Sequence, residues 1–259
     1  MGIDHHFTRA IVRQPPMTAG HGLTTAGLGM PDFPLLAKQH VEYVDALRWA
    51  GLEVEILPAM GDLPDSYFVE DAAIVLPDLA VLTRPAAPER APEPARIAPT
   101  LSRWFPEIAE IRPPGFLDGG DVLITGNVVM VGLSERTNRE GADQLGRLLA
   151  PLGYELRVLE VKEGLHLKSG LTPIAEFILL GCRAYAGQEA LDGFELIEVA
   201  QTEAYAANAL RLNDVLLLAD GHPEVNDRLD ELEGVMLVPL EMSEIAKMDG
   251  GLSCLSLRW

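Results

Sequence analysis

Apolar residues recur along this chain in units of two short strands joined by a tight turn, a helix and a further strand. In three places, two apolar runs flank a pair of turn-forming residues: Pro77-Asp78, Gly126-Asn127 or Asn213-Asp214. Such pairs between apolar runs are typical of β-hairpins. The predicted hairpin strands are residues 71–76 and 79–83, residues 120–125 and 128–132, and residues 208–212 and 215–219.

Two further units are less complete. Residues 174–177 and 178–180 are mainly apolar, but no clear turn separates them. Residues 253–259 form a last strand, which an N-terminal strand at residues 8–13 could complete.

Apolar residues at three- and four-residue spacing between the hairpins predict helices. These helices cover residues 35–49, 136–152 and 224–232, and the strands after them cover residues 53–57, 155–161 and 235–238. The Pro-rich residues 85–99 are expected to lie between regular elements. Five units of roughly fifty residues suit a closed radial array. An open, doubly wound α/β sheet would have the same spacing, so the pattern leaves both open.

The charge of the chain limits its partners. The 259 residues have 48% hydrophobic content and a formal net charge of -19. This length suits one large domain or two small ones. A negative field repels phosphate backbones and anionic lipid, so we expect no nucleic-acid and no membrane partner. The same field would favour a small cation, although acidity also serves solubility.

The cysteine content and the lack of a long apolar run indicate the cellular compartment of the protein. Cys182 and Cys254 are too few for a disulfide framework, which favours a reducing, cytoplasmic setting. No apolar run approaches membrane-spanning length, and residues 1–7 have no apolar signal core. A disulfide between the two cysteines would require an oxidising compartment, which nothing in the sequence indicates.

Two segments carry candidate nucleophilic chemistry. Gly250 and Gly251 lead into a strand with Cys254 near its start, and glycines there permit the close backbone approach that nucleophiles often use. His166 lies among small and polar residues beside a turn, and a neighbouring histidine is the usual partner of a thiolate. Taken singly, such a cysteine is more often a small core residue and such a histidine more often a buried structural one.

Two acidic clusters are candidates for holding a cation. Asp118 and Asp121 flank a Gly-Gly pair, and Asp65, Glu70 and Asp71 precede an apolar strand. Solvated loop charges are the simpler explanation, but paired carboxylates match a planar guanidinium with its five donors. CxxC and HExxH motifs are absent from the sequence, as is a phosphate-binding glycine loop, so we expect no metal and no cofactor.

Together these segments resemble the dimethylarginine dimethylaminohydrolase family of the guanidine-modifying, or pentein, superfamily. The resemblance runs nearly end to end. It is carried in order by PDSYFVEDAAIV (64–75), LDGGDVLITG (117–126), VGLSERTN (131–138), LHLKSG (165–170) and KMDGGLSCLSLR (247–258). It implies an α/β fold, a five-bladed propeller of repeated ββαβ units, in a single catalytic domain spanning residues 1–259.

The resemblance also implies roles for individual residues. Cys254 matches the family's nucleophile, His166 its general acid/base and Asp118 the carboxylate that completes the catalytic set. The positions that match substrate-binding residues are Leu23, Asp65 and Phe68 near the α-amino group, Glu70 and Asp71 near the guanidinium or its loops, Arg90 and Arg136 at the α-carboxylate, and Met248 near the guanidinium. The family has two adjacent arginines where this chain has only Arg90, which leaves Arg84 as an alternative.

The implied reaction converts Nω-methylated arginines to citrulline and a methylamine through a thiouronium intermediate on Cys254, with a small cationic guanidine as the partner. Arginine deiminase, which releases ammonia from arginine, would use the same three catalytic residues. A non-catalytic binder of arginine derivatives on the same fold is a third reading. The sequence leaves a homodimer open.

Overall fold

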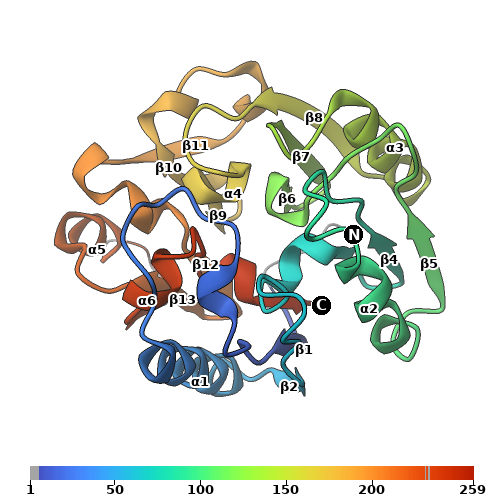
Figure 1. The fold of residues 1–259 in the computed structure, drawn as a ribbon. Helices are drawn as coiled ribbons and strands as arrows, with labels where there is room; N and C mark the ends of the chain where they lie inside the picture. The colour runs from blue at the N-terminus through green and yellow to red at the C-terminus, as the bar shows by residue number, and fades with distance from the viewer. Residues whose placement is uncertain (1–5, 231, 233) are drawn as a thin grey trace.

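Five three-stranded sheets surround one axis in the computed structural model, which describes residues 6–230, 232 and 234–259 (Figure 1). In every sheet the middle strand pairs antiparallel with the inner strand and parallel with the outer one. From inner to outer strand, the sheets are β3 (Ala73–Val75), β4 (Leu79–Leu82) and β5 (Glu107–Glu110); β6 (Val122–Thr125), β7 (Val128–Leu133) and β8 (Glu155–Glu160); β9 (Leu171–Ala175), β10 (Ile178–Cys182) and β11 (Glu195–Val199); β12 (Leu210–Leu212), β13 (Val215–Ala219) and β14 (Met236–Leu240); and β15 (Ser256–Arg258), β1 (Arg9–Arg13) and β2 (Glu53–Leu57). The predicted five-bladed propeller is confirmed, and the open sheet is excluded.

Helices on the outside of the ring connect the middle and outer strands of four blades (Figure 1). They are α1 (Phe33–Trp49), α2 (Glu93–Leu101), α3 (Arg139–Leu149) and α5 (Pro223–Leu229). In the blade of β9 to β11, two 3₁₀ turns, Arg183–Tyr185 and Glu189–Leu191, replace the helix. No helix among the described residues is long and apolar enough to cross a bilayer.

Some elements differ from the sequence-based prediction for local reasons. Helix α2 begins inside the Pro-rich segment, because a proline in the first helical turn loses no hydrogen bond. Helix α3 begins at Arg139 rather than residue 136, because Asn138 caps it by accepting a hydrogen bond from Gly141 N. Strands β5 and β11 were not predicted, since each has only two apolar residues between its glutamates and most of its residues are not fully buried.

The ring closes through the two ends of the described chain. Strand β1 pairs with β15 in the register Ala10 to Arg258, as the sequence predicts. The backbone N–H groups of Thr8 and Arg9 both donate to the Trp259 carbonyl oxygen. The last strand of the chain is therefore the inner strand of a blade whose other strands come first.

A short helical turn lies just before the inner strand of each blade. These turns are η2 (Val69–Ala72), η3 (Gly119–Asp121), α4 (Leu167–Gly170), η7 (Gln201–Ala207) and η8 (Ser253–Leu255). Neighbouring turns contact one another: η8 contacts η2, η2 contacts η3, and α4 contacts both η3 and η7. The equivalent position in each blade thus brings residues from distant parts of the sequence together near the axis.

Asn213, at the predicted turn between β12 and β13, offers a test of this architecture. Its side chain accepts from Phe7 N and donates to the carbonyl oxygens of Phe7 and Ala50, and its φ is 54°. We expect Asn213→Ala to lower the free energy of unfolding by about 2–4 kcal/mol, since it loses the bonds and places alanine in the left-handed region. Denaturant unfolding measures this loss. Asn213→Gly should lose less, because glycine adopts that φ freely. An unchanged midpoint in the alanine variant would contradict the assignment.

Candidate active site

A small cavity of about 20 Å³ lies over the helical turns. Of the residues predicted to form the site, all but Asp118 and Glu70 line it: Leu23, Asp65, Phe68, Asp71, Arg90, Arg136, His166, Met248 and Cys254. Asp118 lies next to the cavity through its contact with His166, and Glu70 faces the opposite side of the turns. The fold therefore gathers residues that span more than 200 positions of the sequence.

Close packing of two glycines positions Cys254 in η8. A Cβ atom on Gly250 would lie 2.3 Å from Phe68, and one on Gly251 would lie 2.5 Å from Asn208. Asn208 also accepts from Ser253 N and donates to Ser253 Oγ. The glycines are therefore needed for close approach, as expected from the sequence.

His166 forms the N-cap of α4. One carboxylate contacts its imidazole ring, and a second accepts a hydrogen bond from the backbone of the next residue. His166 Nε2 lies 3.2 Å from Asp118 Oδ2, and Asp118 is fully buried. Asp121 Oδ1 accepts from Leu167 N, and Ser134 Oγ donates to Asp121 Oδ2. Asp118 Oδ1 is buried and has no hydrogen-bond partner among the described residues, so it is an acceptor still available to a ligand.

Asp71 and Arg90 form a buried pair at the side of the cavity. Arg90 Nη1 donates to Asp71 Oδ2 at 2.5 Å, and Gly120 N donates to Asp71 Oδ1 at 2.8 Å. The other donors of Arg90 reach the Glu93 carboxylate and the carbonyl oxygens of Asp65 and Phe68. One Nη1 hydrogen of Arg90 remains after these bonds.

The two other arginines considered for the carboxylate occupy different places. Arg136 lines the cavity, is half-buried, and its guanidinium forms no ion pair with a described residue. Arg84 lies outside the cavity, where Nη1 donates to the Gly115 carbonyl and the guanidinium stacks on Phe116. The structure thus brings Arg90 and Arg136, but not Arg84, to the site.

The roof of the cavity is a loop tied to the residues before Cys254. Leu23 N donates to both oxygens of Asp65, and a Cβ atom on Gly22 would clash with that carboxylate. Thr25 donates from its backbone and hydroxyl groups to Asp249 Oδ2, and Asp249 has a φ of 56°. The Asp65 and Asp249 carboxylates together hold this loop over the nucleophile.

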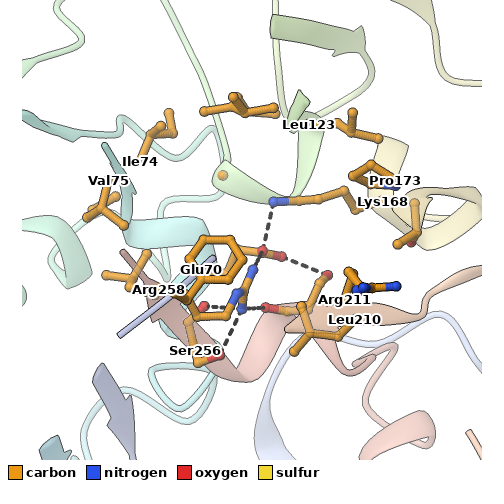
Figure 2. A pocket seen from close by; sticks show the side chains of 18 of the residues that line it. Glu70, Ile74, Val75, Leu123, Lys168, Pro173, Leu210, Arg211, Ser256 and Arg258 are labelled. Atoms are coloured by element: carbon orange, nitrogen blue, oxygen red, sulfur yellow. Dashed lines mark hydrogen bonds and ion pairs between the residues drawn. The ribbon is translucent and has the colours of Figure 1, made fainter. Parts of the chain in front are cut away.

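Glu70 closes the floor of the site. Figure 2 shows Lys168 and Arg258 reaching its carboxylate from two sides, with Lys168 Nζ at 2.7 Å and Arg258 Nη2 at 3.1 Å. Ser253 Oγ donates to the other oxygen of Glu70 at 2.9 Å. Beneath these groups is an axial channel of about 120 Å³, lined mainly by the inner strands. The Glu70 cluster separates this channel from the catalytic cavity.

The surroundings of His166 and Cys254 raise the pKa of both side chains. Burial opposes the charged form of His166, but Asp71, the hydrogen bond with Asp118 and the charge of Asp121 together raise its pKa to about 9. Burial, followed by the charges of Glu70 and Asp71, raises the pKa of Cys254 to about 12. The resting site therefore has a charged imidazole and a neutral thiol at pH 7.

Three of these residues also have the spacing of metal ligands. Ligand atoms of Asp71, Asp118 and His166 lie within 4.8 Å of one another. Both oxygens of Asp71 already accept hydrogen bonds, and His166 Nε2 bonds Asp118 Oδ2. A metal would have to displace these buried bonds, so the arrangement is better suited to acid/base chemistry.

Several residues that support the site were not singled out from the sequence. Asp249 and Lys168 lie inside the motifs around Cys254 and His166, so their position was a usable signal. Asn208 lay in a predicted strand, and Glu93 lay in the Pro-rich segment, where no sequence pattern marked them. Cys182 is buried, and both cysteines are free thiols, which excludes the disulfide alternative in this structure.

Comparison with known proteins places this fold and site in a family. A sequence model of the arginine deiminase family matches residues 36–162. Dimethylarginine dimethylaminohydrolase from Pseudomonas aeruginosa is 34% identical over 254 residues, which cover 98% of this chain and 100% of the relative. The enzyme of the same name from Streptomyces coelicolor is 34% identical over 252 residues, or 96% of each chain.

The solved structures agree. A mutant of the Pseudomonas aeruginosa enzyme in complex with citrulline superposes with a TM-score of 0.95 at 33% identity, over 98% of this chain and 100% of that chain. The N-terminal domain of ArgZ, an arginine dihydrolase, has a TM-score of 0.85 at 21% identity, over 96% of each chain, which shows the shared fold.

Fold and site together define a cysteine-dependent hydrolase of the pentein type, which acts on C–N bonds other than peptide bonds. Within that class, the chain belongs to the dimethylarginine dimethylaminohydrolase family.

The raised pKa of Cys254 predicts a thiol that is slow to alkylate. At pH 8 a pKa of about 12 leaves roughly 10³-fold less thiolate than an ordinary cysteine has. We expect iodoacetamide to label Cys254 slowly, with a rate that rises about tenfold per pH unit between pH 7 and 9 and reaches no plateau. Mass spectrometry of labelled peptides measures the rate, and Cys254→Ser gives the background. A plateau below pH 8 would show that the resting thiol is already ionised.

Proposed function

We propose that this protein hydrolyses asymmetric dimethylarginine and monomethylarginine to citrulline and the corresponding methylamine. The observation that carries the proposal is the free oxygen of Asp118, a buried acceptor beside His166 at the cavity that holds Cys254. A guanidinium donor would satisfy this oxygen and neutralise part of the surrounding negative charge.

The amino-acid end of the substrate binds where Asp65, Arg90 and Arg136 line the cavity. Arg136 supplies a cation for the α-carboxylate, and Arg90 adds its one remaining Nη1 hydrogen. Asp65 and the Leu23 carbonyl bind the α-amino group, with Phe68 as the aromatic wall. Asp71 and the Met248 carbonyl face the guanidinium, whereas Glu70 positions the turns through Ser253 and Lys168.

The reaction begins when the cationic substrate lowers the pKa of Cys254 and the thiol loses its proton to solvent. The Sγ–C bond then forms at the central guanidinium carbon. The His166 imidazolium gives its proton to the methylated nitrogen as the C–N bond breaks, and an S-alkylthiouronium remains on Cys254. General acid help of this kind accelerates a reaction by about 10²–10⁴-fold.

In the hydrolysis of the intermediate, His166 acts as a general base instead of a general acid. The neutral His166 takes a proton from water as the oxygen attacks the thiouronium carbon. The S–C bond breaks, the thiolate leaves, and the hydroxyl proton passes to solvent to give the carbonyl of citrulline. Two easier displacements thus replace one difficult one.

Arginine deiminase chemistry is the second candidate, favoured by the family match at residues 36–162. The same three groups would release ammonia from unmodified arginine. The two reactions therefore differ only in the leaving group, which is a methylamine in one and ammonia in the other. A direct comparison of substrates distinguishes them.

We also propose a cytoplasmic setting and place no nucleic acid or membrane among the partners. Two free cysteines, one of them the nucleophile, support a reducing compartment, and the net charge of -19 disfavours anionic surfaces.

The substrate comparison is the first test. With EDTA present, we expect citrulline from asymmetric dimethylarginine and monomethylarginine at kcat/KM values at least tenfold above that for arginine. Cys254→Ser should release no citrulline from any of the three, because the hydroxyl is a far weaker nucleophile than a thiolate. Faster ammonia release from arginine would instead assign the protein to the deiminases, and loss of turnover with EDTA would reopen a metal role.

Arg136 provides a test of substrate orientation. Removing the charge in Arg136→Gln should raise KM for asymmetric dimethylarginine by about 10–100-fold and leave kcat within about threefold, since the carboxylate lies far from the reacting carbon. Arg84→Gln is the matched control and should change neither value, because Arg84 lies outside the cavity. Steady-state kinetics of the two variants measure both constants. A KM effect in Arg84→Gln alone would place the carboxylate at the alternative arginine.

A further inference from the structure

A second hollow, which we call the side crevice, meets the catalytic cavity at the nucleophile. Its volume is about 600 Å³, and its walls come from the loop before α1, the segment that precedes and enters α4, and η7. It shares Leu165, Asp249, Gly250 and Cys254 with the catalytic cavity. The two hollows therefore adjoin each other at Cys254.

The residues that orient the amino-acid end of the substrate line only the catalytic cavity. Asp65 and Arg136 are absent from the walls of the side crevice, and so is His166. A substrate that extends from Asp65 and Arg136 to Cys254 has its guanidinium carbon at the thiol. A substituent on the guanidinium of such a substrate lies near Cys254, which also lines the side crevice.

The size of the side crevice exceeds what methyl groups need. A methyl group is about as large as a water molecule, whose share of liquid volume is about 30 Å³. Two methyl groups would leave most of the 600 Å³ unfilled. Small and apolar side chains such as Leu28, Ala204 and Ala246 form much of the wall, so an alkyl chain would find favourable contacts there.

The charged side chains that line the side crevice are all acidic. Glu163 and Asp249 are its ionisable carboxylates, and none of the described residues that line it is a lysine, arginine or histidine. Thr25 holds Asp249, whereas Glu163 Oε2 accepts no hydrogen bond from a described residue. The Cys182 thiol lies against the Glu163 carboxylate, whose charge together with burial raises the pKa of that thiol. An anionic group would be repelled here and a cationic one attracted.

From this geometry we infer that the side crevice is a subsite for the Nω substituent, and that the protein hydrolyses arginines with neutral or cationic Nω substituents much larger than methyl. The inference rests on the proposed function, because it extends the substrate class of the same reaction. The leaving group is then a primary alkylamine or a diamine, released after protonation by His166.

Four substrates test the size and charge of the subsite. We expect Nω-propyl-L-arginine to have a kcat/KM within about tenfold of that for monomethylarginine. Nω-(3-aminopropyl)-L-arginine should equal or exceed the propyl compound, and Nω-(2-carboxyethyl)-L-arginine should fall at least 100-fold below it. Citrulline release measures all four.

Variants of the wall connect these rates to the side crevice. Ala204→Phe should lower kcat/KM for the propyl compound more than tenfold and for monomethylarginine less than twofold, because the ring occupies only the crevice. Gln201→Trp, at an exposed position of the same wall, is a second filling variant that preserves folding. Ala95→Phe, at an exposed position of α2, is the matched control and should change neither rate. Glu163→Gln should reduce the preference for the aminopropyl over the carboxyethyl compound.

Two results would overturn the inference. One is turnover of monomethylarginine without turnover of the propyl compound, which would make the side crevice a path for water or the departing amine only. The other is a filling variant that slows both substrates equally. If monomethylarginine itself is not hydrolysed, the proposed function fails. Calorimetry of the same four compounds with Cys254→Ser then tests the subsite separately. Affinities that fall in the order aminopropyl, propyl, carboxyethyl would support the subsite, and tightest binding of the carboxyethyl compound would reject it.

Discussion

The active site depends on the closure of the ring by the pairing of β1 with β15. This antiparallel pair puts the last strand of the chain on the inner side of a sheet whose other two strands are the first ones made. The turn that carries Cys254 precedes β15 directly, so the pairing also sets the nucleophile beside η2. Tyr43 reinforces the closure from α1 through its 2.6 Å hydrogen bond to Ser256. Without this pairing, Cys254 would not lie beside the carboxylates and His166.

Within the closed ring, the site concentrates negative charge and offsets only part of it. Arg90 pairs with both Asp71 and Glu93, while Lys168 and Arg258 pair with Glu70. Asp118 Oδ1 has no hydrogen-bond partner among the described residues. Burial together with the remaining negative charge raises the pKa of Cys254, and the nearby carboxylates outweigh burial to raise the pKa of His166, so the free protein has a charged imidazole and a neutral thiol. A cation bound in this cavity would lower the pKa of Cys254, so in the proposed reaction substrate binding would favour the thiolate.

The sequence predicted the parts of this structure that depend on local patterns. Hairpins with clear turn residues such as Gly126-Asn127 were placed to within two residues, because the turn fixes the register. The choice between ring and open sheet required the pairing of residues 8–13 with 253–259, which periodicity alone does not determine. Catalytic roles came from motifs. No local pattern encodes contacts between residues that are far apart in the sequence. Such contacts include the hydrogen bonds of Arg90, the ion pair of Glu70 with Arg258 and the hydrogen bonds of Asn208 with Ser253.

The order of the catalytic groups along the chain has a consequence for synthesis on the ribosome. Asp71, Asp118 and His166 are made in that order, and Cys254 is made after all of them, in the turn that introduces the closing strand. A nascent chain can form hairpins as they emerge, yet the first blade lacks its inner strand until β15 is released. Cys254 is therefore added only when the strand that closes the ring is also available, and a chain that stops before β15 has Asp71, Asp118 and His166 but lacks Cys254.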